Sequence, residues 1–354
     1  MKFPRRRNWL SAVVLIAALA AGLAAVSRLR QAATTIPAPD ESAVELTITH
    51  DGTTYKVIHG AVYKAGFDPA RLEFVETLYD PDFYGKNYAM VDGVPNRKDP
   101  ETGTLYPTRR HLEEGFESAD GLTDLIGPQR GWTTLTLQSP KAPSVAEYVA
   151  LRKRIMSGQG GFLDNRVEIE KALVHSGERS LRCFSVAPSP GMICAKASLS
   201  NELLHFAKGD DVWFSAWFYV AADGSKPLAL ADLESTWIKE YPGMRIMLDP
   251  AGCLMVELKW ADKPSYRQLP GKEIVFPAGR WTNVRMHLML SEKTDGQVEL
   301  WQDGVSIIRA NGRTLPLASA IYDELEIGIT AHASAPGAAS LYVDDVVISA
   351  DAIR

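Results

Sequence analysis

The chain has 354 residues, of which 46% are hydrophobic and 23% are charged, and its formal net charge is -5. This composition is that of an ordinary globular protein, and it excludes an intrinsically disordered chain and a protein that crosses the membrane many times. The negative charge also excludes a nucleic-acid-binding protein, which needs a clustered basic surface to neutralise phosphates. A chain of this length holds either one large domain or two ordinary ones.

The first thirty residues have the pattern of an export signal. An uncharged run from Trp9 to Val26 covers 18 residues, which is close to the minimum for crossing ~30 Å of hydrocarbon. Basic residues flank this run on both sides: Lys2, Arg5, Arg6 and Arg7 before it, and Arg28 and Arg30 after it. The excess of positive charge before the run favours an N-terminus on the cytoplasmic side of the membrane and a body on the opposite side.

We therefore expect residues 1–27 to be a signal anchor or a cleaved signal peptide, and residues 28–43 to be a polar tether. An anchored chain would lie in the inner membrane and face the periplasm. A cleaved chain would be periplasmic or secreted.

Residues 44–160 are expected to form a region of short β elements and loops that packs on the main domain, residues 161–354. Alternation of apolar and polar residues around Asp51 and Gly52 predicts a hairpin over residues 44–58. One helix is predicted after Pro143, because Ser144 and Glu147 have the spacing of a capping box, and it ends near residues 157–158. Its apolar stripe predicts that the helix packs on the rim of a sheet.

Residues 79–110 contain Asp-Pro, Asp-Gly and Tyr-Pro pairs with little periodicity, which predicts a long decorated loop. Within it, Asp92, Asn96 and Asp99 are either calcium ligands or ordinary turn residues.

From Arg166 onward, short alternating segments separated by turn residues predict strands at the spacing of a sandwich. The clearest segments are residues 180–186, 193–199, 211–220, 227–233, 244–249, 253–260, 281–290, 297–303, 324–330 and 340–349. Because no crossover helices alternate with them, the sheets are expected to be antiparallel. The predicted fold is all-β, an antiparallel sandwich of jelly-roll type with one or two short helices and the N-terminal membrane or signal segment.

Two cysteines have positions that suggest a bond. Cys183 and Cys194 are equally distant from the centre of residues 187–190, which predicts that they face each other across a hairpin. Their Cβ atoms would then lie roughly 4.5 to 5.5 Å apart, and an oxidising compartment would allow a disulfide. The alternative is two reduced, packed thiols, with Cys253 as a further buried thiol.

Side chains alternate along a strand, so each strand divides into a core set and an opposite set. The opposite set of residues 211–220 includes Trp213, Trp217 and Tyr219, and that of residues 281–290 includes Arg285 and His287. The same division assigns further charged residues to the opposite sets of other strands: Asp232, Glu234, Arg245, Asp249, Glu257, Lys259, Glu324 and Glu326.

This mixture of side chains predicts a polysaccharide site. Aromatic rings cover the apolar C–H faces of sugars, and charged groups bind hydroxyls or uronate carboxylates. The predicted substrate-binding residues are Trp213, Trp217, Arg245, Glu257 and Lys259. The alternative is that loops or the helix cover this face, which would make the two tryptophans part of a second core layer.

A family resemblance rests on the sequence Gly-Arg-Trp-Thr-Asn-Val at residues 279–284 and the Gly-x-x-x-x-Trp-x-Asp-Gly pattern at residues 296–304. The combination resembles laminin-G-like and polysaccharide-lyase jelly rolls. Residues 175–182 and 211–220 look like early strands of heparin lyase-like and glucuronan lyase-like enzymes, and residues 341–346 look like their closing strand. The resemblance covers roughly residues 165–349, and it implies a concanavalin A-like fold more directly than an activity.

The chain departs from these lyases at their catalytic positions. Where they carry Gln-x-His, residues 230–235 read Leu-Ala-Asp-Leu-Glu-Ser, and where they carry Lys-x-Gly-x-Tyr, residues 326–330 read Glu-Ile-Gly-Ile-Thr. Elimination from a uronate needs a neutralised carboxylate and a base. If the chain is a lyase, we expect Arg285 or Arg245 to neutralise the carboxylate and His287 or Tyr219 to handle the proton.

Glycoside hydrolysis is the other enzymatic alternative, with Asp232 and Glu234 as acid and nucleophile about 5 to 5.5 Å apart. Laminarinase-type hydrolases share the sandwich but carry Glu-x-Asp-x-(x)-Glu, of which only residues 232–234 are present here.

The sequence therefore predicts an exported, envelope-associated protein that binds or processes a polysaccharide, with lyase or hydrolase activity if it is an enzyme. The alternative is a non-catalytic scaffold or adaptor that binds a protein partner through the same sheet face. Sequence motifs for a phosphate loop, a dinucleotide turn, a zinc site or a nucleophile elbow are absent. No cofactor is expected apart from a structural calcium.

Overall fold

The computed structural model describes residues 46–50, 53–58, 61–64, 83–222, 224, 226–236, 243–259, 265–269, 271–333 and 337–353. All of them belong to one compact unit, Val44–Arg354. The predicted signal segment and tether, residues 1–43, lie outside the described residues. Within the described part of the chain, no helix combines the length and the apolar character that crossing a membrane requires.

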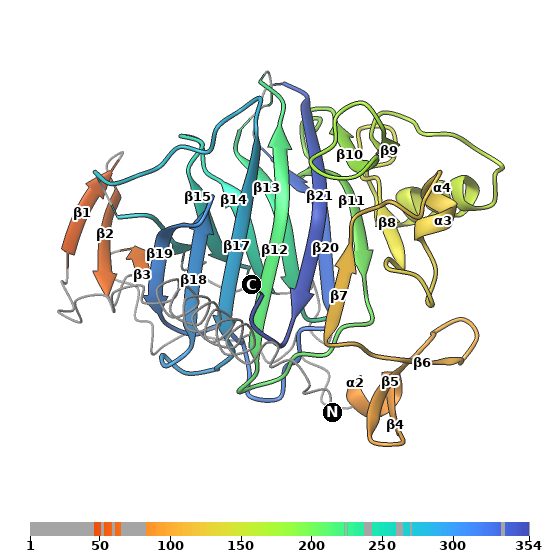
Figure 1. Cartoon of the computed structure of the whole chain (residues 1–354), viewed down its shortest axis with the longest axis horizontal. Coiled ribbons are helices and arrows are strands. Elements are labelled where there is room, and N and C mark those ends of the chain that lie inside the picture. Colours follow the sequence, from red (N-terminus) through yellow and green to blue (C-terminus); the bar gives the residue numbers. More distant parts are fainter. Residues whose placement is uncertain are drawn as a thin grey trace, which may run out of the picture. The chain divides into compact units, whose positions relative to one another are not determined.

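Two large antiparallel sheets form this unit. Sheet A contains, in spatial order, β1 (Leu46–His50), β2 (Thr53–Ile58), β3 (Ala61–Lys64), β16 (Ser265–Tyr266), β15 (Leu254–Leu258), β14 (Gly243–Leu248), β13 (Leu228–Glu234), β20 (Glu324–His332), β11 (Ala195–Asn201) and β8 (Thr134–Thr136). Sheet B contains β19 (Val305–Asn311), β18 (Gln297–Gln302), β17 (Trp281–Met289), β12 (Asp211–Val220), β21 (Ala339–Ser349), β10 (Ser180–Ser185) and β9 (Arg166–Glu170), with β7 (His111–Glu114) paired to β21. Figure 1 shows β18, β17, β12 and β21 side by side.

The all-β prediction is confirmed. Each of the ten strands expected after residue 166 is present, with ends that differ from the prediction by a few residues. The N-terminal hairpin is confirmed by the antiparallel pairing of β1 with β2. Three short helices accompany the sheets among the described residues: α2 (Phe83–Asn87), α3 (Leu122–Leu125) and α4 (Val145–Met156).

Helix α4 begins where the capping box predicted. The Ser144 side chain accepts a hydrogen bond from the Glu147 backbone N–H, and the Glu147 carboxylate accepts one from the Ser144 backbone N–H. The Arg152 guanidinium of α4 donates to the Thr134 hydroxyl on β8. The helix therefore packs at the β8 edge of sheet A.

The prediction of a long loop over residues 79–110 is wrong. This segment contains α2 and a small sheet of β4 (Tyr88–Val91), β5 (Val94–Lys98) and β6 (Leu105–Pro107). The turn residues Asp92 and Gly93 have φ of 50° and 79°, which suits a tight hairpin between strands too short to show periodicity. Asp99 caps the next turn, because its Oδ1 accepts from the backbone N–H groups of Glu101 and Thr102. These residues thus serve turn chemistry here.

The region 44–160 does not stand apart from the sandwich. It supplies β1, β2, β3 and β8 to sheet A, and β7 to sheet B. The two sheets therefore include chain from both sides of residue 161.

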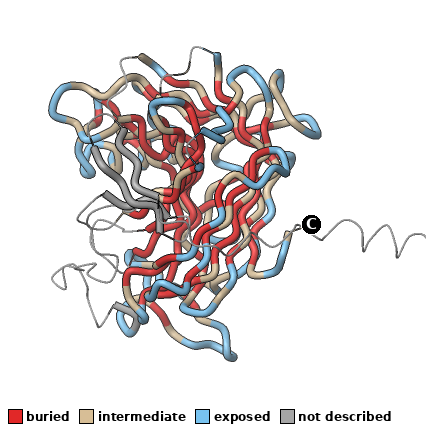
Figure 2. The backbone as a smooth tube through the Cα atoms, turned by 90° about the vertical axis from the view of Figure 1, so that its left-hand side faces the viewer, coloured by how far each residue is buried: buried red, intermediate tan, exposed pale blue. Residues whose placement is uncertain are grey.

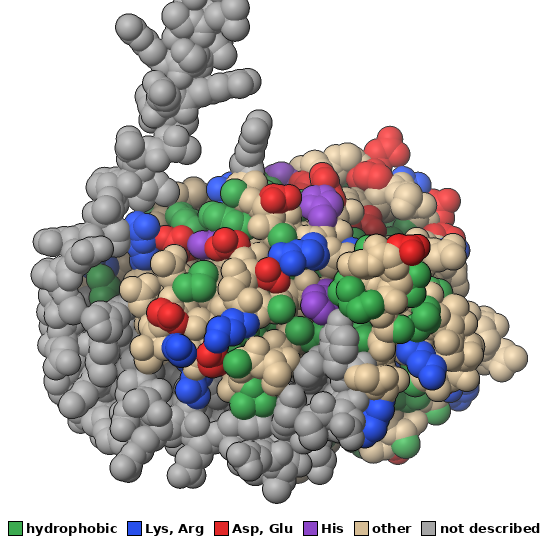
Figure 3. Space-filling view, turned by 90° about the horizontal axis from the view of Figure 1, so that it is seen from below, with side chains coloured by type: hydrophobic (Ala, Val, Ile, Leu, Met, Phe, Trp, Pro, Cys, Tyr) green, Lys and Arg blue, Asp and Glu red, His purple; other side chains and the backbone are tan. Residues whose placement is uncertain are grey.

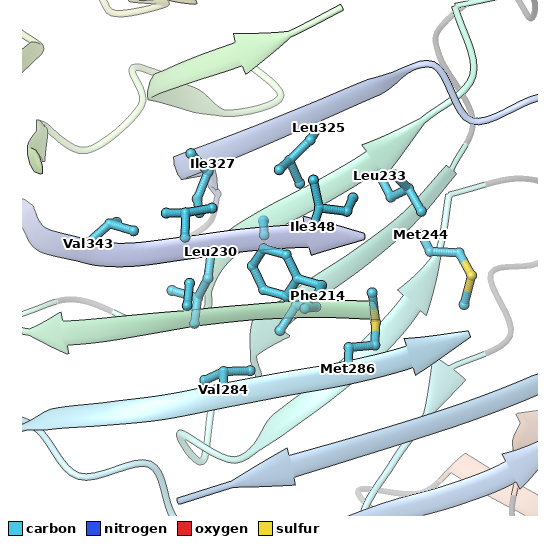
Figure 4. Packing of buried hydrophobic residues seen from close by; sticks show 14 of the residues in the cluster. Phe214, Leu230, Leu233, Met244, Val284, Met286, Leu325, Ile327, Val343 and Ile348 are labelled. Carbon is cyan, nitrogen blue, oxygen red and sulfur yellow. The ribbon is translucent and has the colours of Figure 1, made fainter. Parts of the chain in front are cut away.

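The hydrophobic core lies between the two sheets. Figure 4 shows Phe214, Val284 and Met286 of sheet B and Leu230 and Leu325 of sheet A at this interface. Figure 2 shows that buried residues run along the strands, whereas exposed residues gather in the connections. Because one face of each sheet is buried in this way, the alternate side chains of each strand point to the outer faces.

The predicted disulfide is absent, and all three cysteines are free. The predicted hairpin does not form, because β10 with Cys183 belongs to sheet B while β11, which follows Cys194, belongs to sheet A. Cys183 is fully buried and packs towards Gly328 of the opposite sheet, where an added Cβ would lie 2.7 Å from the Cys183 Sγ. Burial raises the pKa of the Cys183 thiol to about 12, so this thiol stays protonated at neutral pH.

Candidate functional site

The structure does not bring the sequence-predicted site residues to one place. Strands β12 and β17 belong to sheet B, whereas β13, β14 and β15 belong to sheet A. The residues Trp213, Trp217, Tyr219, Arg285 and His287 therefore lie on sheet B, and Asp232, Glu234, Arg245, Glu257 and Lys259 lie on or directly after strands of sheet A. The hydrophobic core separates the two outer faces, so the single predicted site becomes two candidate sites.

The first candidate site, here called the aromatic face, is on the outer side of sheet B. It consists of Trp213, Trp217 and Tyr219 on β12, Trp281, Arg285 and His287 on β17, and Trp301 on β18. Antiparallel register pairs Trp213 with His287, Ser215 with Arg285 and Trp217 with Asn283. Trp213 and Trp217 are half-buried. The face is thus partly open to solvent in the described structure.

Trp213 is stacked on the imidazole of His287. Their ring centroids are 4.1 Å apart and their planes differ by 17°. The ring of Trp301 is also nearly parallel to that of Trp213, with a centroid distance of 6.2 Å. His287 Nε2 lies 2.7 Å from Asp211 Oδ1, and His287 Nδ1 lies 2.9 Å from Glu299 Oε2. Burial alone lowers the pKa of His287, but the hydrogen bonds to Glu299 and Asp211 outweigh it, so the net pKa is raised above 6.5. This arrangement favours an imidazolium that donates from both nitrogens.

Trp217 has a matching partner. The imidazole of His175, from the loop before β10, stacks on it with centroids 3.7 Å apart and planes 15° apart. His175 Nδ1 lies 2.7 Å from Asp345 Oδ2 on β21. Each tryptophan on β12 is therefore held by a histidine that is itself held by a carboxylate. The sequence reasoning missed His175, because it lies in a loop without periodic signal.

Arg285 is the exception on this crowded face. It is half-buried and forms no hydrogen bond or ion pair with any residue in the described part of the chain. By register it lies opposite Ser215, between the positions of Trp213 and Trp217, and opposite Trp301 on its other side. The five N–H donors of this guanidinium are thus available to a ligand.

The predicted lyase roles do not fit together on the aromatic face. His287 has both ring nitrogens engaged by carboxylates, so the imidazolium has no free nitrogen to accept a proton. Tyr219 lies four residues along β12 from Ser215, the register partner of Arg285, which corresponds to a separation of roughly 13 Å. A base and a carboxylate-neutralising group must serve the same sugar ring. These residues therefore form no lyase pair with Arg285.

The second candidate site, here called the charged face, is on the outer side of sheet A. It consists of Lys196, Asp232, Glu234, Arg245, Lys259 and Glu326. The register across neighbouring strands pairs Asp232 with both Arg245 and Glu326, and Glu234 with Glu324. Figure 3 shows that acidic and basic side chains are also interspersed on the face of the molecule seen from below.

The charges of this face are closely paired. Arg245 donates to Asp232 from Nε at 2.8 Å and from Nη2 at 2.5 Å. Lys259 Nζ donates to Asp232 at 2.8 Å and also to Glu234. Lys196 Nζ donates to Glu326 at 2.8 Å. The Asp232 side chain is fully buried, whereas those of the three cations remain 14 to 20% exposed.

Oxygens of Asp232, Glu234 and Glu326 lie within 4.8 Å of one another, which is close enough to hold a metal ion. Three cationic side chains already bind these same carboxylates. A divalent cation would have to displace an ammonium or a guanidinium, so this donor set does not fit a resident metal.

Two carboxyl groups of sheet A differ sharply in acidity. Burial alone raises the pKa of Asp232, but the charges of Arg245 and Lys259 outweigh it and hold the pKa far below its usual range. Burial, followed by the nearby charges of Glu202 and Glu326, raises the pKa of Glu324 from 4.5 to about 8. The raised pKa favours the protonated form of the Glu324 carboxyl group at neutral pH. The sequence placed it on an outer face without marking it as unusual.

No family model and no curated protein matches the sequence. Among solved structures, the chain is similar to an endo-β-1,4-glucuronan lyase from the fungus Trichoderma reesei, with 11% identity and a TM-score of 0.47 over 68% of this chain and 95% of that one. A cellulose-induced protein has 16% identity and a TM-score of 0.43, over 63% of this chain and 95% of that one. An alginate lyase has 10% identity and a TM-score of 0.39 over 68% and 97%.

These solved structures include polysaccharide lyases, the group that the sequence resembles. At such identities and TM-scores, the similarity assigns no activity and no site residue to this chain. The class of protein that its own strand order defines is an antiparallel β-sandwich.

Replacing Arg245 with Met is expected to destabilise the protein by about 3 to 5 kcal/mol, because it leaves the buried Asp232 without its bidentate partner. Urea unfolding at pH 7 measures this loss. Arg280→Met is the matched control, since Arg280 is 63% exposed in its ion pair with Asp303 and its loss is expected to cost less than about 1 kcal/mol. Equal losses in the two variants would contradict the structural role of Arg245.

Replacing Glu324 with Gln is expected to stabilise the protein increasingly as the pH rises from 4.5 to 8. Because the folded pKa is raised, the contribution of Glu324 is present below its unfolded pKa and is lost as the pH approaches about 8. Each unit of pKa shift corresponds to roughly 1.4 kcal/mol, so the free energies of unfolding of variant and wild type are expected to differ by a few kcal/mol at high pH. Urea unfolding of both proteins at pH 5 and pH 8.5 measures it.

Glu113→Gln is the control for this series, because the Glu113 side chain is 74% exposed. A difference between Glu324→Gln and wild type that stays constant with pH would show that Glu324 has an ordinary pKa in the folded protein.

Proposed function

We propose that this protein binds an acidic polysaccharide through the aromatic face of sheet B. The observation that carries the proposal is the half-buried Arg285, which has no hydrogen-bond or ion-pair partner among the described residues and lies between two fixed tryptophans. Arginine binds carboxylates in a bidentate manner, and indole rings cover the apolar faces of sugars. A guanidinium among aromatic rings therefore matches a chain of uronic acids or another anionic sugar.

The geometry suits an extended ligand. Trp213 and Trp217 are four residues apart on one strand, which corresponds to roughly 13 Å, and Arg285 is opposite the residue midway between them. A glycan that lies along β12 would contact both indoles and present an acidic group to the guanidinium. Because their histidine partners fix the two indoles, little side-chain entropy is lost on binding.

Binding is preferred to lyase catalysis for the aromatic face. Of the two bases expected for the lyase role, His287 has both nitrogens engaged, and Tyr219 lies roughly 13 Å along the strand from the register partner of Arg285. A protein partner instead of a glycan is the alternative, and the binding experiment distinguishes the two.

Replacing Arg285 with Gln is expected to weaken binding of an acidic polysaccharide, such as a polyuronate, about tenfold or more, because a charged hydrogen bond contributes about 1.5 to 3 kcal/mol. Binding of a neutral glucan is expected to be unchanged. Trp217→Ala is expected to weaken the binding of both. Isothermal titration calorimetry at low salt measures the affinity of wild type and of both variants for each glycan.

Arg154→Gln is the matched control, because Arg154 is an exposed arginine on α4 and its loss should leave both affinities unchanged. The proposal fails if the wild-type protein binds neither glycan. It also fails if Arg154→Gln reduces acidic-glycan binding as strongly as Arg285→Gln.

A second candidate function is glycoside hydrolysis at the charged face, and one observation favours it. Glu324, with its raised pKa, is the register partner of Glu234, which forms an ion pair with Lys259. A neutral acid beside an ionised carboxylate is the division of roles that glycosidases use. In this candidate Glu324 takes the acid role that the sequence analysis gave to Asp232 or Glu234.

Release of new reducing ends from the same glycans tests this candidate. Glu324→Gln and Glu234→Gln are expected to abolish the release, while Arg154→Gln leaves it unchanged. The candidate is excluded if the wild-type protein produces no new reducing ends from any glycan that it binds.

Export to the cell envelope is part of the proposal. It is supported by the basic residues and the apolar run within residues 2–30. A polysaccharide outside the cytoplasm would be accessible to an exported body, whether the segment remains as a membrane anchor or is removed.

A further inference from the structure

His287 connects the aromatic face to pH. Its ring stacks on Trp213 at a centroid distance of 4.1 Å, and its nitrogens lie 2.7 Å from Asp211 and 2.9 Å from Glu299. The residue is 8% exposed, so water contributes little to its hydrogen bonding. The orientation of the ring is therefore set by two carboxylates from two different strands.

The charged groups around His287 come from each neighbouring strand. Asp211 on β12 has a side chain that is 52% exposed, and Glu299 on β18 has one that is 15% exposed. Arg309 on β19 donates from Nε to Glu299 Oε1 at 2.8 Å, and Arg285 is two residues from His287 on β17. Trp213, which stacks on His287, and Trp301, which stacks on Trp213, are neutral.

The two carboxylates require two donors. An imidazolium has two N–H groups and donates to both, whereas a neutral imidazole has one N–H and one lone pair. After loss of the proton, one carboxylate therefore faces a lone pair, and the ring is no longer held from both sides. Trp213 then loses the fixed stacking partner that determines its orientation.

We infer that the protonation of His287 controls glycan binding at the aromatic face, with tight binding in the protonated state and weaker binding in the neutral state. This inference rests on the proposed function and adds the regulation of the same site. His287 acts as a positioning residue for Trp213, and the ligand itself contacts the indole and Arg285. A parallel pair among the described residues, His175 stacked on Trp217, has one carboxylate partner, Asp345, at hydrogen-bonding distance.

The test is the affinity of the full-length protein for a neutral glucan and for a polyuronate, measured by calorimetry from pH 5.5 to pH 9. The wild-type affinity for both glycans is expected to fall about fivefold or more as the pH rises, a typical size for coupling between two sites. The neutral glucan removes any contribution from titration of the ligand. His287→Gln is expected to bind with an affinity that is independent of pH over this range.

His111→Gln is the control, because His111 is 60% exposed on β7 and its loss should leave the wild-type pH profile unchanged. The titration of the His287 imidazole, followed by NMR in wild type and in Trp213→Phe, provides a readout that does not depend on glycan. Its midpoint is expected to coincide with the midpoint of the affinity profile.

The outcomes are distinguishable. Glycan binding that does not change with pH, while the His287 imidazole titrates within the range, overturns the inference and leaves the proposed function intact. A wild-type profile that persists in His287→Gln overturns it as well. Absence of glycan binding at every pH overturns the proposed function, and the inference with it.

Discussion

The structure depends on the burial of one apolar face of each sheet against the other. Phe214 and Met286 from sheet B meet Leu233 and Leu325 from sheet A in this interface. Because side chains alternate along a strand, fixing the inner residues also fixes which residues face outwards. Every functional candidate in the molecule is a consequence of this constraint, since the aromatic and charged faces are the outward alternates of core-forming strands.

The two outer faces use charge in opposite ways. On the charged face, each carboxylate has a cationic partner, and removing charges from water is costly unless the pairing is good. Such a network holds neighbouring strands in register, and it leaves few donors for a ligand. On the aromatic face, Arg285 has no partner among the described residues, although it stands among tryptophans. The unpaired cation is the more informative of the two features for binding.

Imidazole stacking gives the aromatic face its rigidity. Trp213 and Trp217 each lie against a histidine, and each histidine is anchored by at least one carboxylate. The indoles are therefore held by groups that come from different strands and from a loop. A platform built in this way is ordered before a ligand arrives, and its order depends on the hydrogen bonds that fix the two histidines.

The strands and the helix cap could be predicted from the sequence alone, because they follow from local alternation and from short-range hydrogen bonds. The sequence also predicted that Trp217 and His287 point away from the core, because the two-residue alternation of a strand is visible in that strand alone. It failed over residues 88–107, where strands of three to five residues are too short to show a period. The sheet that each strand joins became known only from the folded structure. That choice separated Arg285 from Arg245 and Cys183 from Cys194, and it brought His175 into stacking contact with Trp217. Sheet membership depends on contacts between residues far apart in the chain, and a pattern within one strand carries no information about them.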